Sequence, residues 1–287
     1  MRSIIFVTIG SSFIAACTVL AKIAQSDLLG IPLHPLQVAQ ARFLFAFMAV
    51  ALVTPLLRPE FTKPSLIIHS VRTFCGYSAV SLLFAAAAII PVADATAIKF
   101  LNPVFAMFFA LPILREKIGP LRWIAALIGL TGSTILIRPT EGSFEPAALM
   151  ALTASLAAGL EMVLIKILTG RESPIQILLI NNAIGLFLSS IALIFVWDSP
   201  TTGQWMVLAS IGFLMVIGQA FNLQAFKGAD ATFVLPFAYS TLIFVTVYDF
   251  LVFSAVPDLI SYMGSAVIIF GAVLLTVPEM RKSKLLR

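Results

Sequence analysis

Apolar runs that are long enough to cross a lipid bilayer follow one another along almost the whole chain. The hydrocarbon core of a bilayer is about 30 Å thick, and a helix of about twenty residues spans it. Of the 287 residues, 60% are hydrophobic and 11% are charged, whereas a soluble domain carries about 25% charged residues. These polar residues are too few to cover a soluble protein. We predict an all-α integral membrane protein that lies in the lipid bilayer and has no sizeable soluble domain.

Ten transmembrane helices are predicted from these runs. They cover residues 4–24, 35–57, 66–90, 95–114, 119–137, 146–168, 174–197, 203–226, 231–253 and 256–277. Polar and turn-forming residues separate the runs, and the polar segment 138–145 lies between the fifth helix and the sixth.

An internal repeat divides the ten helices into two groups of five. The tetrapeptide Ala93-Asp94-Ala95-Thr96 occurs again as Ala229-Asp230-Ala231-Thr232, and Gly76 and Gly212 precede the two copies by the same interval. Two further pairs correspond, namely Pro35-Leu36-Gln37 with Pro174-Ile175-Gln176 and Lys22 with Lys166. Because the two halves repeat each other, we predict one five-helix repeat in residues 1–140 and a second in residues 141–287.

Lysine and arginine residues are concentrated in alternate segments between the helices. One set of segments contains Arg2, Arg58, Lys63, Arg115, Lys117, Arg122, Lys166, Arg171, Lys227, Arg281, Lys282, Lys284 and Arg287. The other set contains little beyond Arg138. Since cytoplasmic loops collect Lys and Arg, we predict a protein of the cell inner membrane with both termini in the cytoplasm. Five helices per repeat then invert the second repeat. The net charge of +5 reflects this topology and does not indicate nucleic-acid binding.

The first repeat also contains a recognisable set of residues. They are Arg42-Phe43-Leu44, Arg72, Gly76, Ala95, Asn102-Pro103-Val104-Phe105, Leu114-Arg115-Glu116-Lys117-Ile118, Gly129 and Gly132. This pattern resembles the EamA repeat of the drug/metabolite transporter superfamily, and the resemblance covers nearly the whole chain in two copies. It implies ten helices and movement of a small metabolite by proton-linked transport, exchange or facilitated diffusion. In the second copy the position of Glu116 falls near Ala255, so this acidic residue is not carried over.

Ionisable side chains inside the predicted helices are the first candidates for a substrate site, because each is costly at membrane depth. Arg42 and Arg72 lie about two turns into the second and third helices, and Lys99 lies about one turn into the fourth. For the two arginines the alternative is a structural role, in which each side chain extends to the membrane interface and contacts loops, backbone carbonyls or lipid phosphates. Glu161 lies in the middle of the sixth helix and is a candidate partner for Lys99. We expect Asp249, near the outer end of the ninth helix, to extend to the interface in the same way.

Two prolines mark candidate hinges in helices related by the repeat. Pro103 cannot donate a hydrogen bond to the carbonyl of Lys99, and Pro236 leaves a carbonyl free in the ninth helix. Freed carbonyls in membrane helices are satisfied by neighbouring groups or line a polar cavity. Asn102 and Tyr239 add hydrogen-bonding groups beside the two prolines. The alternative is a bend that serves packing alone.

Further polar residues could complete a substrate site or merely bridge helices. They are Gln219, Asn222 and Gln224 in the eighth helix, with Asn181 and Asn182 in the seventh. Glycines at 129, 132, 264 and 271 provide small faces for close helix packing, and these faces also permit a homodimer.

Three classes of function are compatible with a membrane protein of this kind. A secondary transporter is favoured, because inverted repeats with a site at their interface are typical of that class. A membrane-embedded enzyme would need a nucleophile with a base or a metal cluster, and we predict no cofactor and no metal site because His34 and His69 stand alone. A sensor or scaffold would need an output segment. Among solutes, the embedded cations favour an anionic or electron-rich group, and phenylalanines such as Phe100, Phe221 and Phe237 favour a flat ring. We expect an aromatic or heterocyclic metabolite such as riboflavin, with an amino acid exporter as the alternative.

Overall fold

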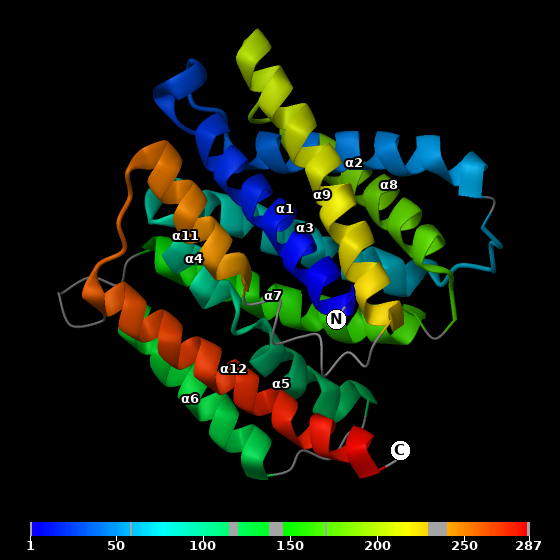
Figure 1. The fold of residues 1–287 in the computed structure, drawn as a ribbon. Coiled ribbons are helices and arrows are strands. Elements are labelled where there is room, and N and C mark those ends of the chain that lie inside the picture. The colour runs from blue at the N-terminus through cyan, green and yellow to red at the C-terminus, as the bar shows by residue number, and fades with distance from the viewer. Residues whose placement is uncertain are drawn as a thin grey trace.

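The computed structural model describes residues 2–57, 59–114, 120–137, 146–169, 171–228 and 240–285, and nearly all of them are helical. The helices are α1 (Arg2–Ala24), α2 (Pro35–Leu57), α3 (Leu66–Ile89), α4 (Val92–Lys99), α5 (Asn102–Leu114), α6 (Pro120–Ile137), α7 (Pro146–Thr169), α8 (Pro174–Leu193), α9 (Thr202–Gly228), α11 (Ser240–Phe253) and α12 (Leu259–Leu285), with a 3-10 turn η1 (Asp27–Leu29) after α1 (Figure 1).

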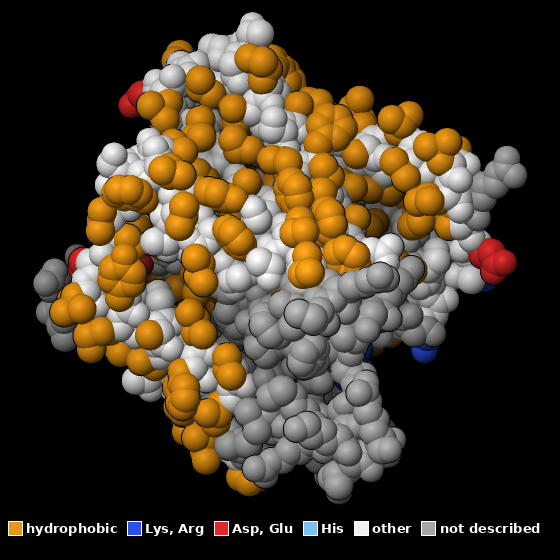
Figure 2. Space-filling model, viewed as in Figure 1, with side chains coloured by type: hydrophobic (Ala, Val, Ile, Leu, Met, Phe, Trp, Pro, Cys, Tyr) orange, Lys and Arg blue, Asp and Glu red, His pale blue; other side chains and the backbone are white. Residues whose placement is uncertain are grey.

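The all-α membrane architecture is confirmed. Within the described ranges, seven segments are long and apolar enough to cross a membrane, and two shorter apolar helices cover Ser240–Phe253 and Leu259–Gly271. Figure 2 shows apolar side chains over most of the described surface on one face, with the few visible charged side chains near its edges. Such a surface is suited to contact with lipid.

The fourth predicted span is broken rather than continuous, which corrects the prediction of one helix over residues 95–114. Helix α4 ends at Lys99 and α5 begins at Asn102, with Phe100 and Leu101 between them. Pro103 is the second residue of α5, where its missing N–H is not needed because the first N–H groups of a helix have no intrahelical acceptor. The same residue prevents α4 from continuing, so the proline converts one span into two helices.

Other boundaries differ by smaller amounts. Helix α8 ends at Leu193, earlier than predicted, and α12 extends to Leu285, later than predicted. Of the ninth predicted helix the structure describes the part from Ser240 onward. The hinge candidate Pro236, the candidate Tyr239 and the repeated Asp230 lie outside the described residues.

Helices of one half pack mainly against helices of the other half. Helix α1 packs along α9, and α3 packs along α7. The repeat relates these two pairs, because α1 corresponds to α7 and α3 corresponds to α9. The pairs α2 with α8 and α6 with α12 also join equivalent helices of the two halves, as Figure 1 shows for α6 and α12. This pairing is what an internal duplication with a common interface would produce.

The predicted glycine faces are used for close packing within the chain. A Cβ atom on Gly132 of α6 would lie 2.9 Å from the carbonyl oxygen of Gly264 and 2.8 Å from the backbone nitrogen of Ile268 in α12. Only glycine permits this approach of two helix backbones. Because the faces around Gly132 and Gly264 contact each other, they are not free for the dimer contact that the sequence allowed.

Two equivalent glutamines connect the halves at opposite ends of the helices. Gln176, the third residue of α8, accepts from the backbone N–H of Thr62 (2.8 Å) and donates to the Thr62 carbonyl (2.9 Å). Gln37, the third residue of α2, donates to the carbonyl of Asp198 (2.6 Å) and accepts from its N–H (3.1 Å). Both glutamines are fully buried. The sequence correspondence of Pro35-Leu36-Gln37 with Pro174-Ile175-Gln176 thus marks two copies of one tertiary contact.

Replacing Gln37 with Leu should destabilise the protein by about 1–3 kcal/mol, since it leaves backbone groups of Asp198 without their partner. The apparent melting temperature of purified protein in detergent measures this loss. Gln224→Leu, at an exposed position of α9, is the matched control and should not lower that temperature. Equal melting temperatures for Gln37→Leu and wild type would contradict the prediction.

Candidate functional site

The break between α4 and α5 lies against α7, a helix of the other half. The hydroxyl of Ser155 in α7 donates to the carbonyl of Lys99 at 3.1 Å. This is the carbonyl that Pro103 leaves without an intrahelical donor. One turn further along α7, a Cβ atom on Gly159 would lie 2.9 Å from the carbonyl oxygen of Asn102. Small residues of α7 therefore allow the broken helix to approach, and one of them satisfies its exposed backbone.

Four of the predicted candidates form a charged cluster beside this break. Arg72 of α3 places Nη2 3.5 Å from Oε1 of Glu161 in α7. Arg42 of α2 and Lys99 at the end of α4 each interact electrostatically with Glu161 as well. Helices from both halves thus bring three cationic side chains around one carboxylate. We call these four residues the charged cluster.

The members of the charged cluster differ in how much of each residue is exposed. Arg42 and Arg72 are 6% and 5% exposed, which disfavours an interpretation as side chains that extend to the membrane interface. The side chain of Glu161 is 22% exposed, and Lys99 is partly exposed. The two arginines are therefore deep in the protein, whereas Glu161 and Lys99 are partly exposed.

Gly76 of α3 makes room for the carboxylate. A Cβ atom at this position would lie 2.8 Å from Oε1 and 2.9 Å from Cδ of Glu161. In the sequence, Gly76 is notable only as part of the repeat. The structure shows that the absence of a side chain at this position leaves space for the Glu161 carboxylate. Its counterpart Gly212 instead accommodates Phe45 of α2.

The remaining polar candidates lie elsewhere or bridge helices. Asn102 donates through Nδ2 to the sulfur of Met162 at 3.2 Å, so it contacts α7 beside Glu161. Asn181 accepts from the hydroxyl of Thr73 at 3.1 Å and connects α8 to α3. Asn182 donates to the Leu178 carbonyl of its own helix.

Gln219 and Asn222 of α9 are not brought into contact with the charged cluster in the described part of the chain. A Cβ atom on Gly10 of α1 would lie 2.6 Å from Oδ1 of Asn222. Cys17, which interacts electrostatically with Arg42, contacts the carbonyl of Ile211 on the same helix α9 (3.4 Å). Asn222 lies eleven residues beyond Ile211, which is about 16 Å along the helix at 1.5 Å per residue. Asn222 is therefore distant from the part of α9 that contacts Cys17, the residue that interacts with Arg42.

Comparison with known proteins identifies the family. The sequence profile of the EamA-like transporter family matches residues 1–138 and again residues 145–277. The chain belongs to the EamA-like transporter family. The resemblance to the drug/metabolite transporter superfamily is thereby confirmed. The protein is a multi-pass membrane transporter with a small-molecule substrate rather than an enzyme or a sensor.

Curated relatives of this EamA-family protein carry different solutes. It is 30% identical over 223 residues to a riboflavin transporter of Vibrio cholerae, covering 75% of this chain and 73% of the relative. An S-adenosylmethionine uptake transporter of Rickettsia prowazekii is 26% identical and covers 90% of this chain and 88% of its own. A pseudopaline exporter of Pseudomonas aeruginosa is 26% identical, with 72% and 73% covered.

One solved crystal structure has the same fold. It superposes with a TM-score of 0.65 at 17% identity and covers 96% of this chain and 98% of its own. At this identity the likeness concerns the fold alone.

Asp249 of this EamA-family protein is buried, contrary to the prediction that it extends to the interface. It is 2% exposed, pairs through Oδ1 with Lys22 at 3.0 Å, and accepts through Oδ2 from the N–H of Val92 at 3.1 Å. The N-terminus of a helix has unsatisfied N–H groups and favours an acidic partner. Because α11 packs against both α1 and α4, Asp249 serves the start of α4 and the end of α1 together.

A second buried ionisable pair was not found from the sequence. His69 in the first turn of α3 donates through Nε2 to Oε2 of Glu172 (2.8 Å), and both side chains are at most 2% exposed. Glu172 also accepts from the N–H of Ser65 (3.1 Å) and from Gln176 (2.7 Å). His69 and Glu172 are distant in sequence, so no spacing could indicate the pair. This cluster joins the two loops at the same end as the Gln176 contact.

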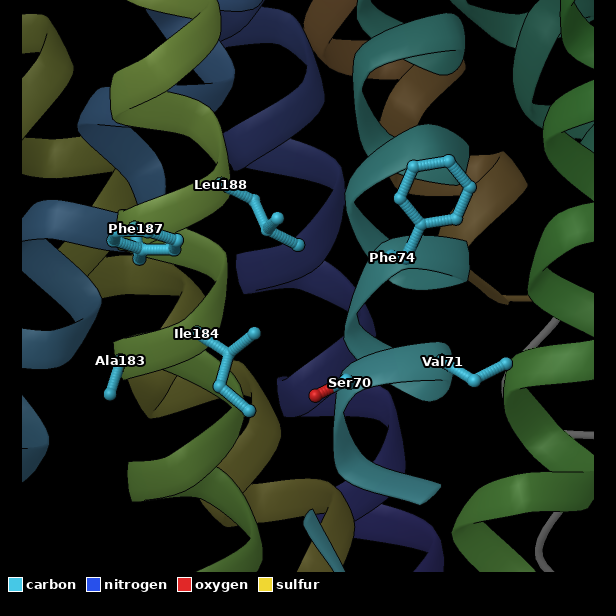
Figure 3. A pocket seen from close by; sticks show the side chains of 7 residues that line it. All are labelled: Ser70, Val71, Phe74, Ala183, Ile184, Phe187 and Leu188. Carbon is cyan, nitrogen blue, oxygen red and sulfur yellow. The ribbon is translucent and has the colours of Figure 1, made fainter. Parts of the chain in front are cut away.

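An apolar groove of about 670 Å³ runs between α3 and α8 (Figure 3). Its lining residues are Ser70, Val71, Phe74, Ala183, Ile184, Phe187 and Leu188. Phe74 and Phe187 are 60% and 67% exposed, so the groove is on the outer surface, whereas Arg72 of the same helix faces inward. With Ser70 as its one polar lining residue, the groove is suited to lipid chains and not to a polar solute.

The Glu172 cluster predicts a dependence of stability on pH. Burial opposes ionisation of Glu172, but hydrogen bonds from His69, Ser65 and Gln176 outweigh it and lower the pKa of this carboxyl below its ordinary value of 4.5. A carboxyl whose pKa is lowered by folding stabilises the folded state above its ordinary pKa, and this contribution is lost as pH falls through the lowered value. We expect the difference in melting temperature between wild type and Glu172→Gln to be largest near pH 7. It should shrink steadily below pH 4.5; a difference that stays constant from pH 7 to the acid limit would contradict the assignment.

Proposed function

We propose that this protein is a secondary transporter that moves a small organic metabolite across the cytoplasmic membrane by alternating access. The observation that carries the proposal is the break between α4 and α5, which lies against α7 of the other half, with the charged cluster beside it. Discontinuous helices at a repeat interface are where secondary transporters bind substrate and coupling ions. Asn102 and Pro103 at the start of α5 belong to this site as a polar contact and a hinge.

The proposed solute is an aromatic or heterocyclic metabolite, with riboflavin as the concrete example. Similarity to curated riboflavin transporters at 30% and 28% identity supports this choice. Among the phenylalanines considered for ring stacking, Phe221 packs between Phe6 and Phe13 of α1, whereas Phe100 lies at the helix break itself. An amino acid or other metabolite exporter is the second candidate, supported by similarity to an exporter of the same family.

Lys99 should be essential if it contacts substrate or holds Glu161. We expect Lys99→Met to abolish saturable uptake or efflux in vesicles, with normal expression and folding. Lys99→Arg should recover only part of the flux, because a planar guanidinium does not replace a compact ammonium. Flux is normalised to the amount of folded protein.

Lys63→Met is the matched control for Lys99→Met, because Lys63 is exposed in the loop before α3. It should leave flux within about twofold of wild type, since an exposed loop charge contributes little. Near-normal transport by Lys99→Met would remove Lys99 from the site.

The proposed orientation has both termini in the cytoplasm of a cell with an inner membrane, which follows from the Lys and Arg distribution. A cysteine replacing Lys63, in a background with Cys17 and Cys75 changed to Ala, should react with an impermeant thiol reagent only from the cytoplasmic side. A cysteine replacing Thr202 should react only from outside. The opposite pattern at both positions would invert the topology.

A further inference from the structure

The two arginines of the charged cluster retain buried hydrogen-bond donors. In the part of the chain that the structure describes, Nε and Nη1 of Arg42 and Nε and Nη1 of Arg72 have no hydrogen-bond partner. Both residues are more than nine-tenths buried. Buried polar groups in native proteins are nearly always hydrogen-bonded, and a buried cation without a partner is especially costly. These four nitrogens therefore call for an acceptor that the described residues do not supply.

The charge of the cluster points to the kind of acceptor. Three cations, Arg42, Arg72 and Lys99, face one carboxylate, Glu161, so the cluster carries an excess of two positive charges. The contact between Glu161 and Arg72 is loose at 3.5 Å, compared with about 2.8 Å for a strong charged hydrogen bond. Glu161 thus neutralises the arginines only in part.

We propose that Arg42 and Arg72, with Lys99 beside them, bind a carboxylate or phosphate group of the transported solute. Guanidinium groups present several N–H donors in a plane that matches the oxygens of such groups. Glu161 is the internal counter-ion whose hold on Arg72 the oxyanion of the solute replaces. This inference rests on the proposed transport function and adds that the preferred solute carries such a group. Riboflavin has neither a carboxylate nor a phosphate, so within the proposed aromatic class the inference favours an anionic derivative such as a phosphate ester.

The experiment compares oxyanion binding by purified protein in neutral detergent. The melting temperature is measured in sodium phosphate, sodium acetate and sodium chloride at equal ionic strength, over a concentration series. An anion that binds only the folded state raises this temperature saturably. We expect a saturable rise of several degrees with phosphate or acetate over chloride for wild type. The rise should be absent in Arg42→Gln and Arg72→Gln and partial in Arg72→Lys.

Controls separate the site from general salt effects, because phosphate also stabilises proteins by exclusion from their surface. Arg171→Gln removes an exposed loop cation and should keep the wild-type rise. Glu161→Gln removes the competing carboxylate and should enlarge it. The same rise in wild type and in both arginine variants would overturn the inference. If Arg42→Gln and Arg72→Gln fail to fold, Arg42→Lys and Arg72→Lys replace them. The anion-dependent rise in melting temperature of these variants should then be smaller than that of wild type, and an equal rise would overturn the inference.

A flux measurement distinguishes failure of this inference from failure of the transport function. In vesicles, labelled riboflavin is competed with unlabelled riboflavin or riboflavin 5′-phosphate, which share the ring and differ by one phosphate. We expect the phosphate ester to compete at least about tenfold more strongly, which corresponds to roughly 1.4 kcal/mol, and this advantage should vanish in Arg72→Gln. Saturable riboflavin flux with no advantage for the ester would overturn the inference and leave the transport function standing. Oxyanion binding without saturable riboflavin flux would instead contradict riboflavin as the proposed solute and leave the oxyanion site standing.

Discussion

The interior of a membrane offers no water to satisfy a charge or an unpaired backbone group, and the structure of this protein follows from that constraint. Pro103 leaves the Lys99 carbonyl in the fourth span without an intrahelical donor, and the hydroxyl of Ser155 from the opposite half donates to it. The N-terminus of α4 needs an acceptor, and Asp249 of α11 supplies it while pairing with Lys22. Helix α4 is therefore held at both ends by side chains from other helices.

The repeat supplies a symmetric scaffold, whereas the charged cluster is asymmetric. The glutamine contacts at Gln37 and Gln176 are two copies of one interaction. The correspondence that aligns these glutamines also aligns Arg42 with Asn181, and the one that aligns Lys22 with Lys166 aligns Cys17 with Glu161. At these two charged positions the other half thus has a neutral residue. Duplication could build the interface, and divergence of a few inward-facing residues could then give it a polar site.

The fold and the charged cluster depend on different residues. A fold shared at 17% identity therefore says little about the transported solute. Helix packing depends on glycines and apolar faces that many sequences provide, as Gly132 against Gly264 illustrates. On our proposal, the solute instead meets a handful of side chains at the α4–α5 break. Relatives named for riboflavin, S-adenosylmethionine and pseudopaline are all similar to this chain, so similarity of sequence alone does not fix the solute.

Apolar run length and local motifs are properties of consecutive residues. The membrane class, the apolar spans, the internal duplication and the transporter family could therefore be predicted from the sequence, but the break of the fourth span into α4 and α5 could not. The sequence also singled out Arg42, Arg72, Lys99 and Glu161, since charges inside apolar runs are rare enough to notice. Tertiary structure alone decided which of these meet: Glu161 lies beside Arg72 because Gly76 leaves room, and Asn222 contacts α1 instead. It also decided that Asp249 is buried and that His69 finds Glu172, two pairings between segments far apart in the chain. Such contacts depend on how helices of the two halves pack, and no local spacing in the sequence encodes that packing.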